Sequence, residues 1–255
     1  MQTLVYDGSF AGWLSAVFDV YEYRYTDATI QPHNQRQDNL FGSTSEVYTD
    51  KGKAARVLEG LKKKVSKQAI TQIHRTFLSE QAGMEDMLLQ YVQYAFKNTA
   101  SIETDYSHRA VLYVSDMAKK VHREKHRMEA FVRFQRTHDD LYYATVEPDF
   151  NVLPLIQEHF EKRYADQQWM IYDVKRKYGI YYNLHHTSPV QVDFNELKTK
   201  SADTVAIFND TEEVYQYLWQ QYFTNVNIKA RKNLKLHIRH MPKRYWKYLT
   251  EKRLI

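Results

Sequence analysis

The chain has 255 residues, of which 43% are hydrophobic and only 12 are Gly or Pro, a composition typical of a folded protein. Its net charge is +5 and it contains no cysteine, which excludes disulfides, thiolate zinc sites and cysteine-ligated iron–sulfur clusters. No apolar run approaches the ~20 residues that span a bilayer and no secretory signal begins the chain, so a cytoplasmic protein is expected.

The first 98 residues predict helices and one loop. Ser9 is a good N-cap, because its hydroxyl can accept a hydrogen bond from a backbone N–H at the helix start. One apolar face follows at helical spacing, made by Phe10, Trp13, Leu14, Val17, Phe18 and Tyr21. Residues 27–50 are polar and predict a loop, with a short strand around Leu40 and Phe41. Three more helices are expected over residues 51–98, the last of them separated from the second at Gly83.

A longer helix is predicted for residues 103–125, and its end is densely basic. Seven of nine successive positions carry Lys, Arg or His, namely Lys119, Lys120, His122, Arg123, Lys125, His126 and Arg127. Cations near a helix C-terminus suit the helix dipole, which accounts for some of these residues but not for seven.

Residues 131–184 predict a small ββαββ unit. Strands are expected at 131–136 and 141–147 around a turn at Asp139 and Asp140, and again at 169–174 and 180–184. Asn151 is expected to cap the helix between the pairs, with His159 as a hydrogen-bonded core histidine. The fold class is therefore α+β, in which a helical N-terminal half packs with an antiparallel sheet and C-terminal helices. We expect one domain, 1–255, with possible sub-lobes 1–127 and 128–255.

The C-terminal segment is strongly basic. A helix is expected at 211–223, and a short terminal helix begins near Pro242. From Lys229 to Ile255 there are ten Lys or Arg residues and one acidic residue, so the rest of the chain is slightly acidic. A localised basic patch of this size attracts phosphate. The simpler interpretation is a solvated tail.

Most catalytic and metal-binding patterns are missing. His122 and His126 have the spacing of helical metal ligands, but Glu does not follow the first His and the flanking cations would repel a metal. The phosphate-loop, dinucleotide-binding and nucleophile-elbow motifs do not occur. Four side chains remain as isolated acid–base candidates without a geometric argument: Glu147, His159, Asp173 and Asp193. No metal or cofactor is expected, and the catalytic residues are unknown.

Basic and aromatic side chains form two clusters that could recognise a partner. Arg offers planar donor pairs to phosphate and guanine, and Tyr and Trp stack on unpaired bases. The candidate nucleic-acid-binding residues are Arg123, His126, Arg127, Arg133, Lys243, Arg244, Tyr245 and Trp246. Arg, Tyr and Trp are also enriched in protein–protein interfaces, so a protein partner is an equal alternative.

Four segments resemble a known family: YDGSFAGWLSAVFDVY, VHREKHRMEAFVRF, MPKRYWKYLTE, and the long stretch from ATVEPDF to KYGIYYN. They are similar to the DUF4130 family of bacterial DNA-metabolism proteins. The resemblance implies a role in DNA repair or modification with a radical SAM partner protein that has a DNA-binding region. Longer members carry a C-terminal uracil-DNA glycosylase-like domain, which we expect to be absent because this chain stops just after the MPKRYW motif.

The expected function is thus that of an accessory protein of DNA repair or modification, which binds DNA and the radical SAM protein. Because the chain has no cysteine, radical SAM chemistry would have to come from another chain. Two alternatives stay open: an enzyme acting on nucleic acid, such as a glycosylase or hydrolase, and a protein scaffold that does not touch DNA. Whether the chain is an enzyme is left undecided.

Overall fold

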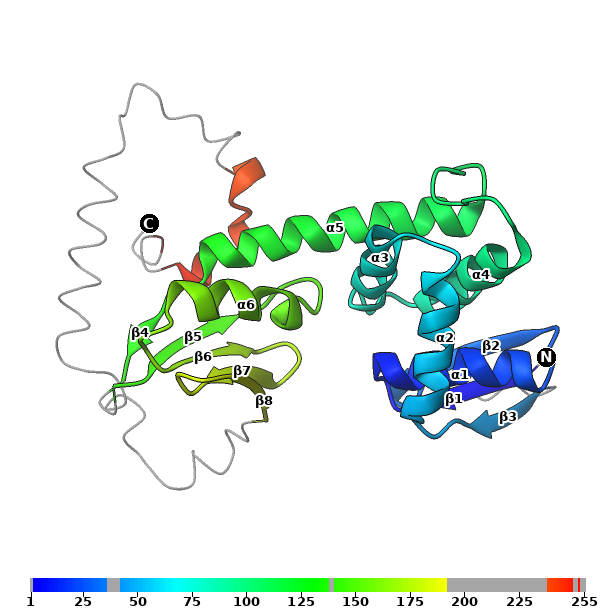
Figure 1. The fold of residues 1–255 in the computed structure, drawn as a ribbon. Coiled ribbons are helices and arrows are strands. Elements are labelled where there is room, and N and C mark those ends of the chain that lie inside the picture. The colour runs from blue at the N-terminus through cyan, green and yellow to red at the C-terminus, as the bar shows by residue number, and fades with distance from the viewer. Residues whose placement is uncertain (1, 36–41, 138–139, 192–237, 250–251, 253–255) are drawn as a thin grey trace. The chain divides into compact units, whose positions relative to one another are not determined.

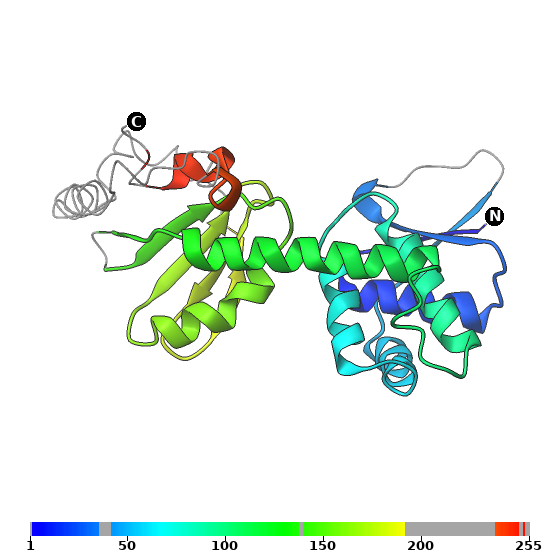
Figure 2. The same cartoon turned by 90° about the horizontal axis from the view of Figure 1, so that it is seen from above.

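The computed structural model describes residues 2–35, 42–137, 140–191, 238–249 and 252. The chain divides into two compact units, Met1–His122 and Arg123–Ile255, here called unit 1 and unit 2. The division falls inside helix α5 (Arg109–Phe131). Figures 1 and 2 show that each unit combines a sheet with helices, so the predicted α+β class is confirmed.

Unit 1 contains a three-stranded parallel sheet that the sequence did not predict. Its strands are β1 (Gln2–Tyr6), β2 (Ala28–Pro32) and β3 (Ser43–Glu46), in the order β2-β1-β3. The central strand β1 is almost wholly buried, so it shows no alternation of polar and apolar residues. The expectation of a helical N-terminal half is corrected here. Leu40 and Phe41 lie outside the described residues.

The helices of unit 1 follow the predicted apolar periodicity. They are α1 (Phe10–Glu22), α2 (Lys51–Lys62), α3 (Lys67–Phe77), α4 (Met84–Lys97) and the short 3-10 turn η1 (His33–Gln35). The Ser9 hydroxyl caps α1 as predicted, because it accepts a hydrogen bond from the Gly12 N–H at 2.9 Å. Gly83, in the left-handed region, is the N-cap residue that precedes α4. Helix α5 begins and ends later than the predicted 103–125.

Unit 2 is built on a mixed five-stranded sheet. The strands are β4 (Gln135–Arg136), β5 (Tyr142–Val146), β6 (Trp169–Asp173), β7 (Tyr178–Tyr182) and β8 (Thr187–Val190), paired in chain order. Strands β5 and β6 are parallel, because helix α6 (Leu153–Arg163) connects them as a crossover, whereas the other pairs are antiparallel. The expected purely antiparallel sheet is therefore corrected.

Three local predictions also change. The first strand is limited to Gln135–Arg136, since α5 continues to Phe131. Val152, not Asn151, is the N-cap of α6, and the Asn151 side chain accepts a hydrogen bond from the Tyr178 hydroxyl at 2.5 Å. The side chain of His159 is 36% exposed and therefore is not in the core.

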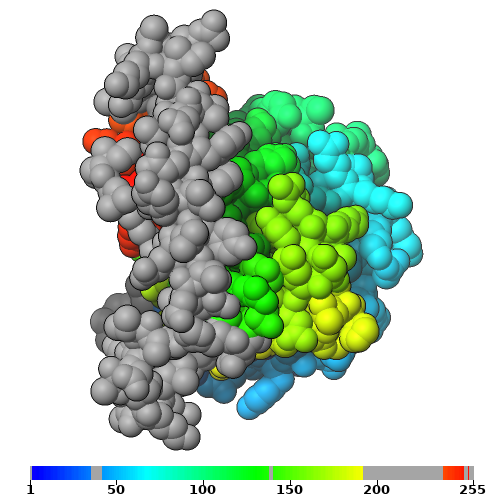
Figure 3. Space-filling view, turned by 90° about the vertical axis from the view of Figure 1, so that its left-hand side faces the viewer, coloured from blue at the N-terminus to red at the C-terminus, as the bar shows by residue number. Residues whose placement is uncertain are grey.

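The core of unit 2 is aromatic and lies between α6 and the sheet. Phe160 of α6 meets Trp169 of β6 edge-on, with ring centroids 6.0 Å apart, and Phe134 packs on Phe160 at 5.7 Å. In the space-filling view of Figure 3 the yellow-green surface of α6 adjoins the green surface of the preceding segments. Among the described residues, no helix has the length and apolarity needed to cross a membrane. The helix predicted at 211–223 lies outside them.

Candidate nucleic-acid interface

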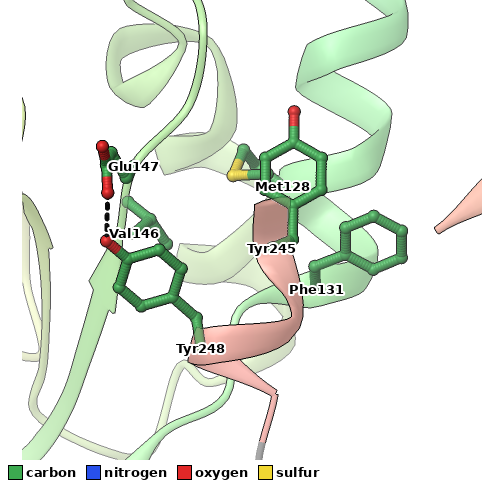
Figure 4. Close-up of a pocket in the computed structure, with 6 residues that line it drawn as sticks. All are labelled: Met128, Phe131, Val146, Glu147, Tyr245 and Tyr248. Carbon is green, nitrogen blue, oxygen red and sulfur yellow. Dashed lines mark hydrogen bonds between the residues drawn. The ribbon is translucent and has the colours of Figure 1, made fainter. Parts of the chain in front are cut away.

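The end of α5 and a 3-10 helix near the C-terminus, η4 (Lys243–Tyr248), pack together in unit 2. Pro242 precedes η4, at the place where the sequence predicted a terminal helix, and its carbonyl accepts the Tyr245 N–H at 3.1 Å. Tyr245 is 2% exposed, and its ring centroid lies 5.6 Å from that of Phe131. Figure 4 shows Tyr245 beside Met128 and Phe131 of α5.

A buried carboxylate, Glu124 of α5, holds the two segments together. Its side chain is 1% exposed and accepts hydrogen bonds from the Tyr245 hydroxyl and from the Asp149 N–H at 2.9 Å. The Arg127 guanidinium donates to the other carboxylate oxygen at 3.3 Å. A buried carboxylate costs several kcal/mol unless it is paired and hydrogen-bonded, so these partners are what makes the position tolerable.

Arg244 forms the outer layer of this cluster. Its Nη2 lies 3.5 Å from Glu124 Oε2 and 2.5 Å from Asp149 Oδ2, and it donates to the Tyr245 hydroxyl at 2.6 Å. The Arg244 side chain is 43% exposed, so solvent reaches part of it. Arg127 and Arg244, from segments far apart in the sequence, thus meet at one carboxylate.

The Tyr245 hydroxyl acts here as a proton donor. Burial raises the pKa of Tyr245 far above its ordinary value, and the hydrogen bond to the Glu124 carboxylate raises it further. The hydroxyl therefore stays protonated at physiological pH. Its bond to Glu124 fixes η4 on α5 and is not the arrangement of a catalytic tyrosinate.

A second carboxylate, Glu147, anchors the far end of η4. It accepts hydrogen bonds from the Tyr248 hydroxyl at 2.5 Å and from the Lys247 ammonium group. The hydrogen bond from Lys247 lowers the pKa of Glu147, with Tyr248 adding to the effect. Figure 4 shows the Glu147–Tyr248 contact at the edge of a small pocket. These contacts explain why η4 stays against β5.

The turn between β6 and β7 adds cations beside this cluster. Arg176 donates to the carbonyl oxygens of Pro148 and Asp149 at 3.1 and 3.2 Å, and Lys175 donates to that of Asp149 at 3.3 Å. Arg176 is itself held by the buried carboxylate of Asp173 at 2.8 Å. The backbone at Pro148 and Asp149 is therefore surrounded by positive side chains.

The pocket beside η4 is small. The pocket next to Tyr245 has an empty volume of about 200 Å³, part of it open solvent, below the range of about 300–1,000 Å³ that is usual for ligand pockets. It is lined by Met128, Phe131, Val146, Glu147, Tyr245 and Tyr248. Within the part of the chain that the structure describes, no group of three or more His, Asp or Glu side chains could hold a metal ion.

Residues 82–251 match the model of the family described as Domain of unknown function (DUF4130). The chain belongs to the DUF4130 family. The matched region begins just before α4, so β1–β3 and α1–α3, together with the YDGSF segment, lie outside it. No curated protein matches the chain significantly.

Within the DUF4130 region, the structure brings three of the eight predicted contact residues together. Arg127, Arg244 and Tyr245 meet at Glu124, although the Tyr245 ring faces the interior and Phe131 instead of solvent. Trp246 is half-buried, its ring flanked by the Lys243 and Lys252 ammonium groups at 5.9 and 5.2 Å.

The other predicted residues lie apart from Glu124. Arg123 is exposed on α5. His126 contacts Glu129, with Nδ1 3.0 Å from Oε2. Arg133 donates to the carbonyl oxygens of Ala130 and Val132 at the end of α5, which is a local capping arrangement.

Sequence reasoning about this DUF4130 chain missed the acidic partners, Glu124 above all. The sequence did contain a signal for the position of Glu124. One face of a helix is formed by Val121, Glu124, Met128 and Phe131, according to their spacing. A single Glu on an apolar helical face suggests a buried ion pair. Among the isolated acid–base candidates, Glu147 forms an ion pair with Lys247, and Asp173 forms one with Arg176. Asp193 lies outside the described residues.

Proposed function

We propose that the protein is an accessory factor of DNA repair or modification that binds nucleic acid through the surface made by α5 and η4. This α5–η4 surface is defined by Arg123, Arg127, Lys243, Arg244, Trp246 and Lys247. The observation that carries the proposal is the convergence of Arg127 and Arg244 at Glu124. It places two basic segments of the sequence on one surface.

The ion pair between Arg244 and Asp149 is weak, which favours phosphate binding by Arg244. The Arg244 and Asp149 side chains are 43% and 49% exposed, and a pair with this exposure contributes about 0–1 kcal/mol. A phosphate accepts from two guanidinium N–H groups at once and releases counterions. Phosphate binding can therefore replace the Asp149 contact at small cost while Glu124 continues to hold η4.

The flanking side chains suit an extended anionic ligand. Lys243 and Lys247 are exposed on η4, and Arg123 is exposed on α5. Lys is depleted in protein–protein interfaces, whereas it is a common phosphate-binding residue in nucleic-acid interfaces. Trp246 adds a half-buried aromatic ring next to two ammonium groups, where it could stack on a base.

The partner belongs to the same proposal. The resemblance described above suggests that this chain works with a radical SAM protein, which would supply the chemistry that a cysteine-free chain cannot carry. Co-purification of the two proteins with and without DNA tests this part. A stable complex that never binds DNA through this chain would favour a scaffold instead.

The DNA-binding part is tested by electrophoretic mobility of single- and double-stranded DNA at low salt. We expect the purified chain to retard DNA, and Arg244→Ala to bind more weakly. The matched control is Arg163→Ala, since Arg163 is an exposed arginine on α6 of the same unit. Absence of any retardation at low salt, with or without the partner, would disprove the proposal.

A further inference from the structure

The end of α1 in unit 1 presents tyrosines to solvent around an arginine. The side chains of Tyr21 and Tyr23 are 42% and 59% exposed, and the rings of Tyr23 and Tyr25 lie 5.7 Å apart. Arg24 between them has φ +55°, in the left-handed region where a helix end usually has Gly. A glycine would fit this backbone more easily, so the backbone does not explain the cation at this position.

Helix α2 adds cations next to these rings. Lys53 Nζ and the Arg56 guanidinium lie 5.4 and 5.2 Å from the centroid of the Phe18 ring on α1. Lys62, Lys63 and Lys64 follow at the end of α2, and all three are exposed. Lys53 and Arg56 therefore lie beside the helix that ends in the tyrosines.

Phe96 of α4 joins the two groups. Its ring lies 5.5 Å from that of Tyr21, and a Cβ atom on Gly60 of α2 would approach it to 3.2 Å. Lys64 Nζ donates to the Asn98 carbonyl at 3.0 Å, which holds the end of α2 beside the end of α4. Tyr21 and the last turns of α2 thus lie on the same ring of Phe96. The residues around this junction are here called the Tyr23 surface: Tyr21, Tyr23, Arg24, Tyr25, Arg56, Lys62, Lys63 and Lys64.

The charge of this surface is positive. Asp19 and Glu22 lie 2.7 and 3.5 Å from Lys53, and Glu59 lies 2.6 Å from Lys62. Lys53 and Lys62 together face these three carboxylates, which leaves one negative charge in this paired set. Arg24, Arg56, Lys63 and Lys64 come in addition to those pairs, so the surface has an excess of positive charge next to exposed rings.

We propose that the Tyr23 surface binds single-stranded nucleic acid. Exposed rings stack on bases only where the bases are unpaired, and the adjacent cations match a phosphate backbone. A protein partner fits less well, because the cores of protein interfaces are depleted of charge and of Lys in particular. This site lies in unit 1 and outside the family match, whereas the α5–η4 surface lies in unit 2 and inside the match.

The test is fluorescence anisotropy of a labelled oligo-dT strand, on the order of 16 nucleotides long, with the full chain. Because Tyr23→Ala removes the stacking of one base, we expect it to weaken oligo-dT binding about five-fold or more. Tyr23→Phe keeps an aromatic ring and should retain binding. Tyr48→Ala is the matched control, because Tyr48 is 83% exposed but precedes the opposite end of α2. A duplex of the same length should be insensitive to Tyr23→Ala.

A second variant, which removes one exposed positive charge, tests the proposal without depending on whether Tyr23→Ala disturbs the fold. Lys63→Gln should reduce the salt dependence of oligo-dT binding by about 0.7 in a plot of log affinity against log salt, for one lost phosphate contact. If Tyr23→Ala and Lys63→Gln both bind oligo-dT like the unchanged chain, the Tyr23 surface is ruled out. It is also ruled out if Tyr48→Ala weakens binding as much as Tyr23→Ala does. Loss of binding in Arg244→Ala bears on the α5–η4 surface alone, so the two proposals can fail separately.

Discussion

At the scale of single residues, Glu124 is the side chain on which the packing of the C-terminal segment depends most. It is buried, and it accepts hydrogen bonds from a hydroxyl, a backbone N–H and a guanidinium. Its arginine partners are partly exposed, so they can regain water if the carboxylate is removed. The Tyr245 hydroxyl and the Asp149 N–H cannot do so as easily.

We therefore expect Glu124→Ala to lower the free energy of unfolding by about 1–3 kcal/mol, the cost of leaving buried hydrogen-bonding groups unpaired. Urea unfolding measures this change. Glu158→Ala is the control, because Glu158 is an exposed carboxylate on α6 that pairs with Lys162, and its loss should cost less than about 0.5 kcal/mol. Equal stabilities of the two variants would show that Glu124 does not hold η4.

In unit 1, the buried carboxylate of Glu85 is expected to lower the stability of the fold at neutral pH, in contrast to Glu124. It is buried in the first turn of α4, where its carboxylate accepts a hydrogen bond from the Tyr6 hydroxyl at 3.2 Å. Burial raises the pKa of Glu85 above its ordinary value. A raised pKa means that stability is greatest below the ordinary value and is lost as the pH rises through the folded-state value. At neutral pH the fold is therefore less stable than it would be with Glu85 protonated.

Glu85→Gln should raise the thermal unfolding midpoint at about pH 7, because the amide oxygen can still accept from Tyr6 and no charge is buried. The gain should shrink as the pH falls towards about 4, where Glu85 itself is protonated. Glu59→Gln is the matched control, since Glu59 is exposed and Lys62 lowers its pKa. A midpoint that Glu85→Gln leaves unchanged or lowers at pH 7 would contradict this account.

At the scale of elements, helices were easier to predict than strands. The apolar faces of α1, α2, α3 and α4 were visible as helical periodicity, and Ser9 marked the start of α1. The parallel strands β1–β3 were not visible. They have only four or five residues each, and their partners lie far apart in the sequence. Such strands lack the local turn signals that identify a hairpin.

In the sheet of unit 2, too, the long-range strand pairing could not be predicted from the sequence. Strands β6 and β7 correspond to the strands predicted at 169–174 and 180–184, and they pair antiparallel as neighbouring strands joined by a short turn do. The parallel pairing of β5 with β6 depends on where α6 packs, which no local pattern specifies. Likewise, the basic residues of the candidate interface were recognisable by type, whereas the Arg127–Glu124–Arg244 contact required the three-dimensional structure.

At the scale of the whole molecule, buried tyrosines set an upper pH limit. Burial raises the pKa of Tyr91 and Tyr143 from 10.0 to about 12 in both cases, with Glu103 adding to the effect at Tyr91 and Tyr172 at Tyr143. Because a raised pKa favours the protonated, folded form, the stability that these residues contribute is complete below pH 10 and is lost as the pH rises towards about 12.

We expect the free energy of unfolding to fall between about pH 10 and pH 12, with a fraction of the tyrosines ionising only as the structure is lost. Ultraviolet absorbance of tyrosinate and far-ultraviolet circular dichroism, followed in one titration, measure both events. Ionisation of all 21 tyrosines with the secondary structure intact would contradict the assigned burial.

The most direct test of the central claim is the salt dependence of DNA affinity for the unchanged chain and for Arg244→Ala, with Arg163→Ala as control. If Arg244 contacts a phosphate, its loss should weaken binding and reduce the slope of log affinity against log salt by about one, leaving the control unchanged. Identical slopes and affinities for Arg244→Ala and the unchanged chain would contradict nucleic-acid binding at the α5–η4 surface.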